Sequence, residues 1–286
     1  MNRQNYRLKR NGNTGWGRVK KQLGQHFLKD EQTAERIVSS LKAETDSVLE
    51  IGPGRGVLTQ FLLQRFGERF HAIEIDRELI QYLSEKFPEM EGRLHNEDFL
   101  KIKSLFPPPS KGEGAWRASV ERPRSIALIG NFPYNISTQI IFRVLEFRDS
   151  VKEVVGMFQK EVAKRIVANP GSKDYGIISV LLSVWYEREY LFELPPDAFT
   201  PPPQVHSAVI RLTRNAVKSM ECNEELFKKI VKTAFNQRRK MLRNSLSGLM
   251  DAMILKDKIF EKRPEQLGME EFVKIVKRCE GKELNG

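Results

Sequence analysis

The chain has 286 residues, 40% of them hydrophobic, which is enough for the core of one sizeable domain and a small second one. Its formal net charge of +11 favours a polyanionic partner, because lysine and arginine release counterions when they neutralise phosphates. A basic surface that only keeps the chain in solution would give the same charge. The two cysteines, Cys222 and Cys279, form no C-x-x-C pair, which excludes a disulfide framework and a cysteine zinc site.

Other classes of protein are excluded by what the sequence lacks. The four histidines do not have the spacing of metal ligands, so no metal is expected. No apolar stretch reaches the roughly 18 residues that a membrane-spanning helix needs, and the longest, residues 176–186, is interpreted as a buried strand. No hydrophobic signal region begins the chain. These features predict a cytoplasmic protein without membrane contact.

The first 21 residues contain seven lysines or arginines and no acidic residue. Several asparagines and glycines among them oppose regular structure, so residues 1–21 are predicted to form a flexible basic arm. The arm is suited to phosphate contact, although a solvated tail with no specific role would have the same composition.

An alternation of strands and helices begins at residue 47. Strands are expected at 48–51, 70–75, 93–95, 126–129 and 153–158, with helices at 57–66, 77–86 and 137–147. Such alternation predicts parallel strands joined by crossover helices, and therefore an open α/β sheet. Later strands at 177–185 and 207–212 are expected to add an antiparallel edge.

The alternation of strands and helices is interrupted once, and it ends near residue 214. Residues 104–125 are rich in proline and glycine and are interpreted as an exposed inserted loop. After residue 214 the chain is charged, with helices expected at 224–235, 238–249 and 270–278. We therefore predict an α/β domain over residues 22–214 and a small all-α domain over residues 215–286.

A glycine-rich turn follows the first strand of the alternation. Gly52 and Gly54 are the positions where the backbone is expected to turn tightly against a ligand, at the carboxyl edge of the sheet. Glu74 ends the next strand, where an acid can bind both hydroxyls of a ribose, and Asp98 follows a third strand, placed to accept from an adenine amino group. A tight turn without ligand and a helix cap at Asp98 are the plainer interpretations. Together the three signals favour a cofactor that contains adenosine.

The segment Asn131-Phe132-Pro133-Tyr134 follows the fourth strand at the same edge. An adenine amine is a poor nucleophile, and its methylation requires acceptors that hold the amine hydrogens while positive charge develops on the nitrogen. The Asn131 side-chain oxygen and the Phe132 carbonyl are suitable acceptors, and Tyr134 offers an aromatic face on which a base can stack. A simple turn could contain the same residues.

Six segments in order resemble the KsgA-type ribosomal RNA adenine dimethyltransferases, an S-adenosylmethionine-dependent family with a Rossmann-like class I methyltransferase sheet and a helical C-terminal domain. The resemblance covers roughly residues 20–280. It is carried by the following segments: Gly24-Gln25-His26-Phe27-Leu28, residues 50–56, residues 131–134, residues 158–162, residues 198–203 and Ala234-Phe235-Asn236-Gln237-Arg238-Arg239-Lys240.

The resemblance implies the roles of several residues. It implies cofactor contacts at His26, Leu28, Gly52, Glu74, Asp98 and Asn131. It implies a base pocket in which Phe199 stacks on the adenine opposite Tyr134, beside Asn131; without it, Phe199 would be interpreted as a core aromatic. This sequence has His26 where many relatives have Asn, and Phe132 where Leu is usual.

The substrate that the resemblance implies is small-subunit ribosomal RNA within a pre-ribosomal particle, with two adjacent adenines near the 3′ end modified by a monomeric enzyme. RNA contact is expected from the basic cluster Arg238, Arg239, Lys240 and Arg243, although a solvated helix face would have the same composition. Two alternatives stay open: a relative that methylates large-subunit RNA and confers macrolide resistance, and a non-catalytic ribosome-assembly factor.

Overall fold

The structure, a computed structural model, describes residues 26–105 and 125–283. The predicted basic arm at residues 1–21 and nearly all of the predicted loop at 104–125 lie outside these ranges. None of the helices in the described ranges is long and apolar enough to cross a membrane.

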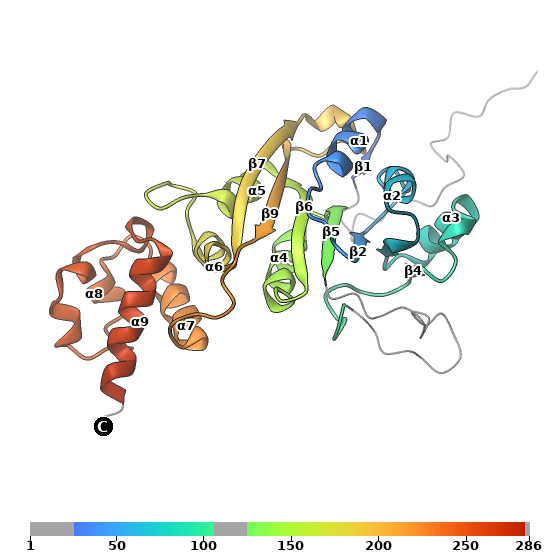
Figure 1. Cartoon of the computed structure of the whole chain (residues 1–286). Helices are drawn as coiled ribbons and strands as arrows, with labels where there is room; N and C mark the ends of the chain where they lie inside the picture. Colours follow the sequence, from blue (N-terminus) through green and yellow to red (C-terminus); the bar gives the residue numbers. More distant parts are fainter. Residues whose placement is uncertain (1–25, 106–124, 284–286) are drawn as a thin grey trace, which may run out of the picture.

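A seven-stranded sheet forms the centre of the molecule, with strands in the order β4-β3-β2-β5-β6-β9-β7 (Figure 1). The first five strands in this order are parallel, and β9 runs antiparallel to both β6 and β7. Strands β1 and β8 pair separately and antiparallel. The strands are β1 (Phe27–Leu28), β2 (Ser47–Ile51), β3 (Phe70–Ile73), β4 (Leu94–His95), β5 (Ile126–Asn131), β6 (Val151–Gln159), β7 (Tyr186–Leu194), β8 (Phe199–Thr200) and β9 (Ser207–Arg214).

Helices cover both faces of the sheet, because alternate residues of its central strands are apolar on both sides. In β5, Leu128 belongs to one buried cluster, while Ala127 and Ile129 belong to the other. The α-helices are α1 (Glu31–Ser39), α2 (Thr59–Phe66), α3 (Arg77–Lys86), α4 (Ser137–Glu146), α5 (Lys160–Val167), α6 (Ile177–Trp185), α7 (Glu224–Asn236), α8 (Leu242–Ser245) and α9 (Met269–Glu283). This arrangement is the predicted class I methyltransferase sheet.

The prediction of a strand at 177–185 was wrong, since these residues form α6. The segment is buried over most of its length, so its apolar residues show neither the period of a strand nor that of a helix. The helix begins where the Ser179 hydroxyl accepts from the Gly176 N–H at 3.1 Å. The strand follows directly as β7, which alternates charged and apolar residues as an edge strand does.

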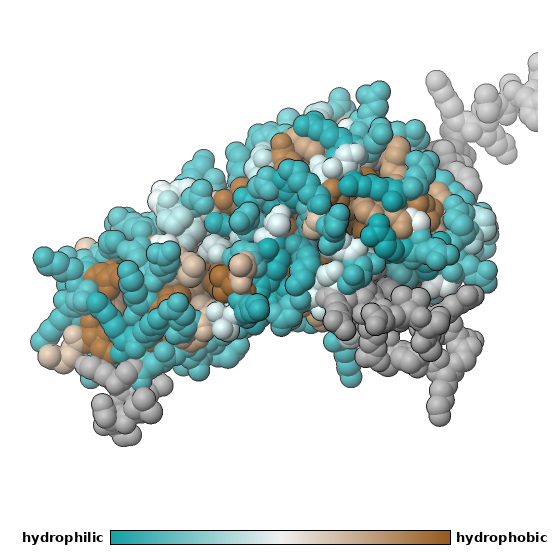
Figure 2. All heavy atoms as spheres, in the orientation of Figure 1, coloured by the Kyte–Doolittle hydropathy of each residue, from teal (hydrophilic) through white to brown (hydrophobic). Residues whose placement is uncertain are grey.

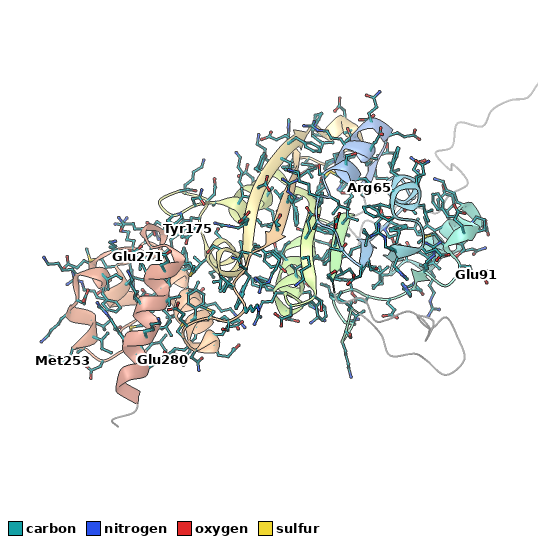
Figure 3. The ribbon with its side chains drawn as sticks, viewed as in Figure 1. Arg65, Glu91, Tyr175, Met253, Glu271 and Glu280 are labelled. Atoms are coloured by element: carbon teal, nitrogen blue, oxygen red, sulfur yellow. The ribbon has the colours of Figure 1, made fainter. Side chains whose placement is uncertain are left out.

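The C-terminal helices gather at one end of the molecule, beyond α6 (Figure 1). Their buried residues share a continuous apolar cluster with α4 and α6, and Tyr175 meets Phe235 of α7 edge to face at 6.0 Å. Tyr175 and Glu271 mark this junction in Figure 3. Polar residues cover most of the face seen in Figure 2, with small hydrophobic groups over these helices.

The prediction of a helix at 238–249 was also wrong, because only the four residues of α8 are helical there. A turn follows α7, and the Leu242 N–H then donates to the Lys262 carbonyl at 2.9 Å, a distant contact that sequence periodicity does not reveal. Leu242 is buried in the core, whereas Met241 is 43% exposed.

Candidate active site

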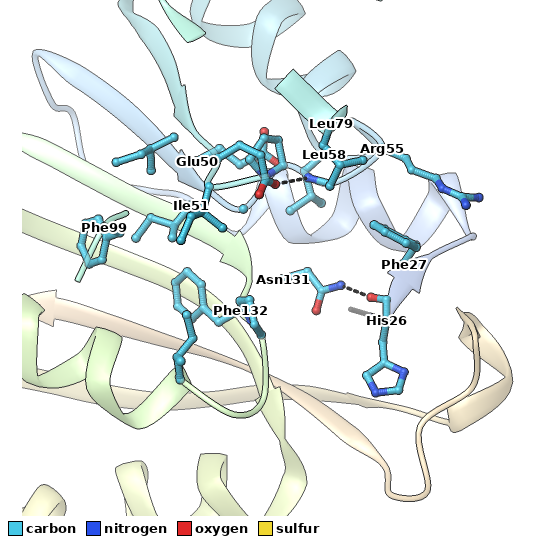
Figure 4. A pocket seen from close by; sticks show the side chains of 18 of the residues that line it. His26, Phe27, Glu50, Ile51, Arg55, Leu58, Leu79, Phe99, Asn131 and Phe132 are labelled. Carbon is cyan, nitrogen blue, oxygen red and sulfur yellow. Dashed lines mark hydrogen bonds between the residues drawn. The ribbon is translucent and has the colours of Figure 1, made fainter. Parts of the chain in front are cut away.

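A pocket lies at the carboxyl ends of β2, β3 and β5, where the crossover topology brings the glycine turn, the acids and the Asn131 loop together (Figure 4). Every expected cofactor residue lines it. Those residues are His26, Leu28, Gly52, Gly54, Glu74, Asp98 and Asn131. Phe132 and Tyr134 line it as well.

The glycine turn adopts a backbone that other residues rarely tolerate. Gly52 has φ +69° and Gly54 φ +58°, both in the left-handed region. A Cβ on Gly54 would lie 3.0 Å from Phe27 Cε1, so the side chain of β1 approaches the turn closely. The N–H of Gly52 donates to the Ile73 carbonyl at 2.9 Å, which joins the turn to the end of β3.

Two buried carboxyls lie beneath the pocket. Glu74 is 6% exposed, and its oxygens accept from the N–H groups of Gly54 at 3.3 Å and Asp76 at 3.0 Å. Glu50, 1% exposed, accepts from the Thr59 hydroxyl at 2.7 Å. Burial raises the pKa of the Glu50 carboxyl to about 8 and also raises the pKa of Glu74, because an ion is poorly solvated there. Both acids therefore bind protons more readily in the folded protein than in water.

Asp98 is placed both to cap a turn and to contact a ligand in the pocket, the two interpretations that the sequence allowed. Its Oδ1 accepts from the Leu100 N–H at 3.0 Å, the capping contact, and its carboxylate lies 3.4 Å from the Lys101 ammonium. The same residue lines the pocket.

The Asn131 amide is oriented by the main chain. Its Nδ2 donates to the His26 carbonyl at 2.7 Å, and a carbonyl oxygen can only accept, so the amide nitrogen must face residue 26. The side-chain oxygen points away from that carbonyl (Figure 4). Asn131 therefore presents an acceptor to the pocket.

Phe132 is packed between two glycines. Its ring is fully buried and meets Phe158 edge to face at 5.2 Å. A Cβ on Gly156 would lie 2.4 Å from Phe132 Cε2, and one on Gly130 would lie 2.8 Å from Cε1. The phenyl ring fills the space that the two glycines leave open. This packing holds the loop backbone, and with it the Phe132 carbonyl, in place.

Tyr134 is held at its ring and at its hydroxyl. The hydroxyl lies 2.5 Å from Ser207 Oγ at the start of β9, and burial raises its pKa. The ring stacks on the His26 imidazole, with centroids 5.2 Å apart and planes inclined by 29°. One face of the expected stacking platform is thus occupied by His26.

Phe199, which the resemblance places opposite Tyr134 in the base pocket, lies in the apolar core in this structure. Phe199 is 1% exposed, belongs to the apolar core, and is not among the described residues that line the pocket. The reason is that β8 pairs with β1 and sets Phe199 opposite Leu28. A stacking role for Phe199 stays a prediction and requires its ring to turn out of the core.

The predicted RNA contacts do not share one helix face, because residues 237–241 form a turn between α7 and α8. Arg239 and Lys240 are exposed there, while Arg238 donates to the Ser172 carbonyl at 3.2 Å. Arg243 lies 3.2 Å from the Glu261 carboxylate. Two of the four basic groups are therefore already engaged within the protein.

Sequence reasoning missed three contributors to the site. Glu50 and Thr59 form the buried pair beneath the glycine turn, and Ser207 holds Tyr134 from a strand 73 residues further along the chain. Glu50 stands within the glycine segment itself, so an acid just before the turn was a usable signal. Nothing in the sequence near Ser207 distinguishes it.

The lining residues fit S-adenosylmethionine. Glu74 offers carboxylate oxygens for ribose hydroxyls, while Ile75, which is 50% exposed, and Phe99 offer apolar surface for an adenine. Acidic residues around the pocket suit a cationic cofactor. Within the described ranges no group of three or more histidine, cysteine or acidic residues is placed to hold a metal ion.

Known proteins resemble this chain over most of its length. The chain is 51% identical to the ribosomal RNA small subunit methyltransferase A of Parabacteroides distasonis, over 90% of this chain and 92% of the relative. It is 48% identical to the protein of the same name from Flavobacterium johnsoniae, over 92% and 96%.

Two solved structures share the fold. A dimethyladenosine transferase from Plasmodium falciparum matches with a TM-score of 0.72 at 24% identity, over 90% of this chain and 98% of the other. The 23S rRNA methyltransferase ErmE matches with a TM-score of 0.62 at 26% identity, over 88% and 99%. The family profile described as ribosomal RNA adenine dimethylase matches residues 17–279. The chain belongs to the ribosomal RNA adenine dimethylase family.

Proposed function

We propose that this enzyme dimethylates the exocyclic amines of two adjacent adenines in the 3′-terminal hairpin of small-subunit ribosomal RNA. The observation that carries the proposal is the oriented Asn131 amide, whose oxygen faces the pocket because its nitrogen binds the His26 carbonyl. The named relatives at 51% and 48% identity, both small-subunit methyltransferases, support this choice of substrate.

The chemistry follows from how the loop holds an amine. S-adenosylmethionine, when bound, supplies an electrophilic methyl group. The Asn131 oxygen and the Phe132 carbonyl accept the amine hydrogens and favour a pyramidal nitrogen whose lone pair can attack in line. No strong base is needed, because the proton leaves a nitrogen that has become cationic. Each nitrogen–carbon bond would form as the bond between the methyl carbon and the cofactor's sulfur breaks, with a neutral thioether as the leaving group and the amine proton passing to water. Two such transfers to each adenine give the dimethylated product.

The target base has to leave its stack to reach this loop. Unstacking costs a few kcal/mol, and stacking on Tyr134 returns about 1 to 3 kcal/mol per base. The Phe199 ring would stack on the other side of the base if it turned out of the core. Cofactor contacts are assigned to the positions of His26, Leu28, Gly52, Gly54, Glu74 and Asp98.

The helical residues 215–286 are proposed as a second domain that places the enzyme on a pre-ribosomal particle in the cytoplasm. Exposed Arg239 and Lys240 are the cations most accessible to phosphate, with Arg238 and Arg243 joining if their present partners exchange. A monomer is sufficient for this arrangement, because the proposed acceptors and stacking residues come from one chain.

A comparison of particles tests the choice of substrate. Labelled methyl transfer is measured with undermethylated small subunits and with large subunits, using wild-type enzyme and Asn131→Ala as the control. We expect label in small subunits alone, lost in the variant. Label in large subunits would support the alternative of a large-subunit enzyme of the macrolide-resistance type; the 23S rRNA methyltransferase ErmE shares the fold. Tight binding without label would support an assembly factor.

A further inference from the structure

His26 joins three segments beside the pocket: the start of β1, the Asn131 loop at the end of β5, and the loop that follows β8. Its carbonyl accepts from the Asn131 amide at 2.7 Å, and its Nδ1 lies 2.8 Å from the Pro201 carbonyl oxygen. Because that oxygen can only accept, Nδ1 carries a hydrogen and donates it. The imidazole thus fixes the chain at residue 26 to the loop that follows β8, next to the point where β1 pairs with β8.

The same ring supports Tyr134. The imidazole lies against one face of the phenol ring, 5.2 Å between centroids, while Ser207 holds the phenol oxygen. Rotation of the Tyr134 ring is therefore restricted at both ends. A base that stacks on Tyr134 uses the face opposite His26.

These contacts set the two groups on which the proposed reaction depends. The carbonyl of residue 26 accepts from the Asn131 amide and so orients it, and the imidazole of the same residue donates to the Pro201 carbonyl. The imidazole ring itself points away from the cofactor side of the pocket (Figure 4). Its contribution therefore passes through Asn131 and Tyr134.

We propose that His26 is a positioning residue, whose N–H to Pro201 holds the Asn131 acceptor in line and whose ring sets the plane of Tyr134. The inference rests on the proposed function, because it assigns Asn131 and Tyr134 their roles in catalysis. The cofactor contact expected at residue 26 is then made by its backbone and not by its imidazole. Loss of the imidazole lowers turnover and RNA affinity, and leaves cofactor affinity nearly unchanged.

Three substitutions separate the two contacts. His26→Asn keeps an N–H at the same reach but has no ring, His26→Phe keeps a ring but cannot donate, and His26→Ala has neither. We expect kcat to fall about 10-fold in the Phe and Ala variants, and to stay within about 3-fold of wild type in the Asn variant. KM for the RNA particle should rise about 2- to 10-fold in the Asn and Ala variants, where the aromatic pair is lost.

Nuclear magnetic resonance measures the hydrogen bonding of the Asn131 side-chain amide directly and does not depend on activity. In protein labelled with nitrogen-15 asparagine, the side-chain signal that disappears in Asn131→Asp is identified as the Asn131 amide. We expect its two proton shifts to be well separated in wild type and His26→Asn, and to approach those of a free amide in His26→Phe. The exposed histidine His206, changed to Ala, is the matched control and should alter neither signal nor kinetics.

The results also separate the inference from the proposed function. Wild-type labelling of small subunits decides the function alone, whereas the amide signals of the variants decide the inference. The inference is overturned if the Phe variant keeps the wild-type amide signal, or if the affinity for S-adenosylmethionine, measured by calorimetry, falls in parallel with kcat. If His26→Ala does not fold, the Asn and Phe variants make the comparison without it.

Discussion

A single methyl group added at Gly156 should disturb the catalytic loop from the strand beside it. A Cβ there would lie 2.4 Å from Phe132 Cε2 and 2.7 Å from Phe158 Cε2, and both rings are fully buried. Overpacking of this kind costs about 1 to 3 kcal/mol, which lowers the melting temperature by roughly 2 to 4 °C per kcal/mol. Displacement of Phe132 also moves its carbonyl, and a misplacement of about 1 Å can cost on the order of 100-fold in rate.

Calorimetric melting and single-turnover methyl transfer should therefore both record a loss in Gly156→Ala. Gly248→Ala is the control, because a Cβ at Gly248 meets no atom within 4 Å and its φ is not positive. Phe132→Leu removes the ε carbons, so the double variant should recover part of the loss, with the Phe158 contact remaining. Wild-type stability and rate in Gly156→Ala, or strictly additive effects in the double variant, would refute the reasoning.

Three further outcomes follow from the site. Asn131→Ala should lower kcat by about 100-fold while the calorimetric Kd for S-adenosylmethionine changes less than about 3-fold; equal losses would count against its role as acceptor. Cofactor binding should release protons and should tighten as pH rises towards 8, because burial raises the pKa of Glu50 to about 8 and a cationic ligand favours the ionised carboxylate; Glu74, whose pKa burial also raises, adds to this in the same direction. Calorimetry in buffers of different ionisation enthalpy measures the proton release. The contribution of His71 to stability should be lost as pH drops below 6.5, because burial lowers its pKa to about 3 and the unfolded chain takes up the proton first, whereas the raised pKa values of Glu50 and Glu74 act in the opposite direction; the melting temperature of wild type relative to His71→Asn should therefore fall with decreasing pH.

The sheet was predictable because its signals are local. The strands expected at 48–51, 70–75, 126–129 and 153–158 are short apolar runs bounded by turns, and each expected bound lies within two residues of the observed one. The glycine turn and the acids were found by their position relative to these strands. Their convergence at one edge then followed from parallel topology alone.

The errors have a different physical origin. Residues 177–185 are buried on nearly all sides, so the pattern of polar and apolar residues did not distinguish helix from strand. After α7, helix propensity was overridden by the contact between Leu242 and Lys262. Ser207 was missed because its position beside Tyr134 depends on the pairing of distant strands, which no local pattern encodes; the burial of Phe199 depends on such a pairing too.

Identification of the methylated nucleosides tests the central claim most directly. Undermethylated small subunits are incubated with enzyme and labelled S-adenosylmethionine, and the RNA is digested and mapped by mass spectrometry. Dimethyladenosine at two adjacent adenines of the 3′-terminal hairpin is the predicted result. Methyl groups on other nucleotides, or none on particles that the enzyme binds tightly, would contradict it.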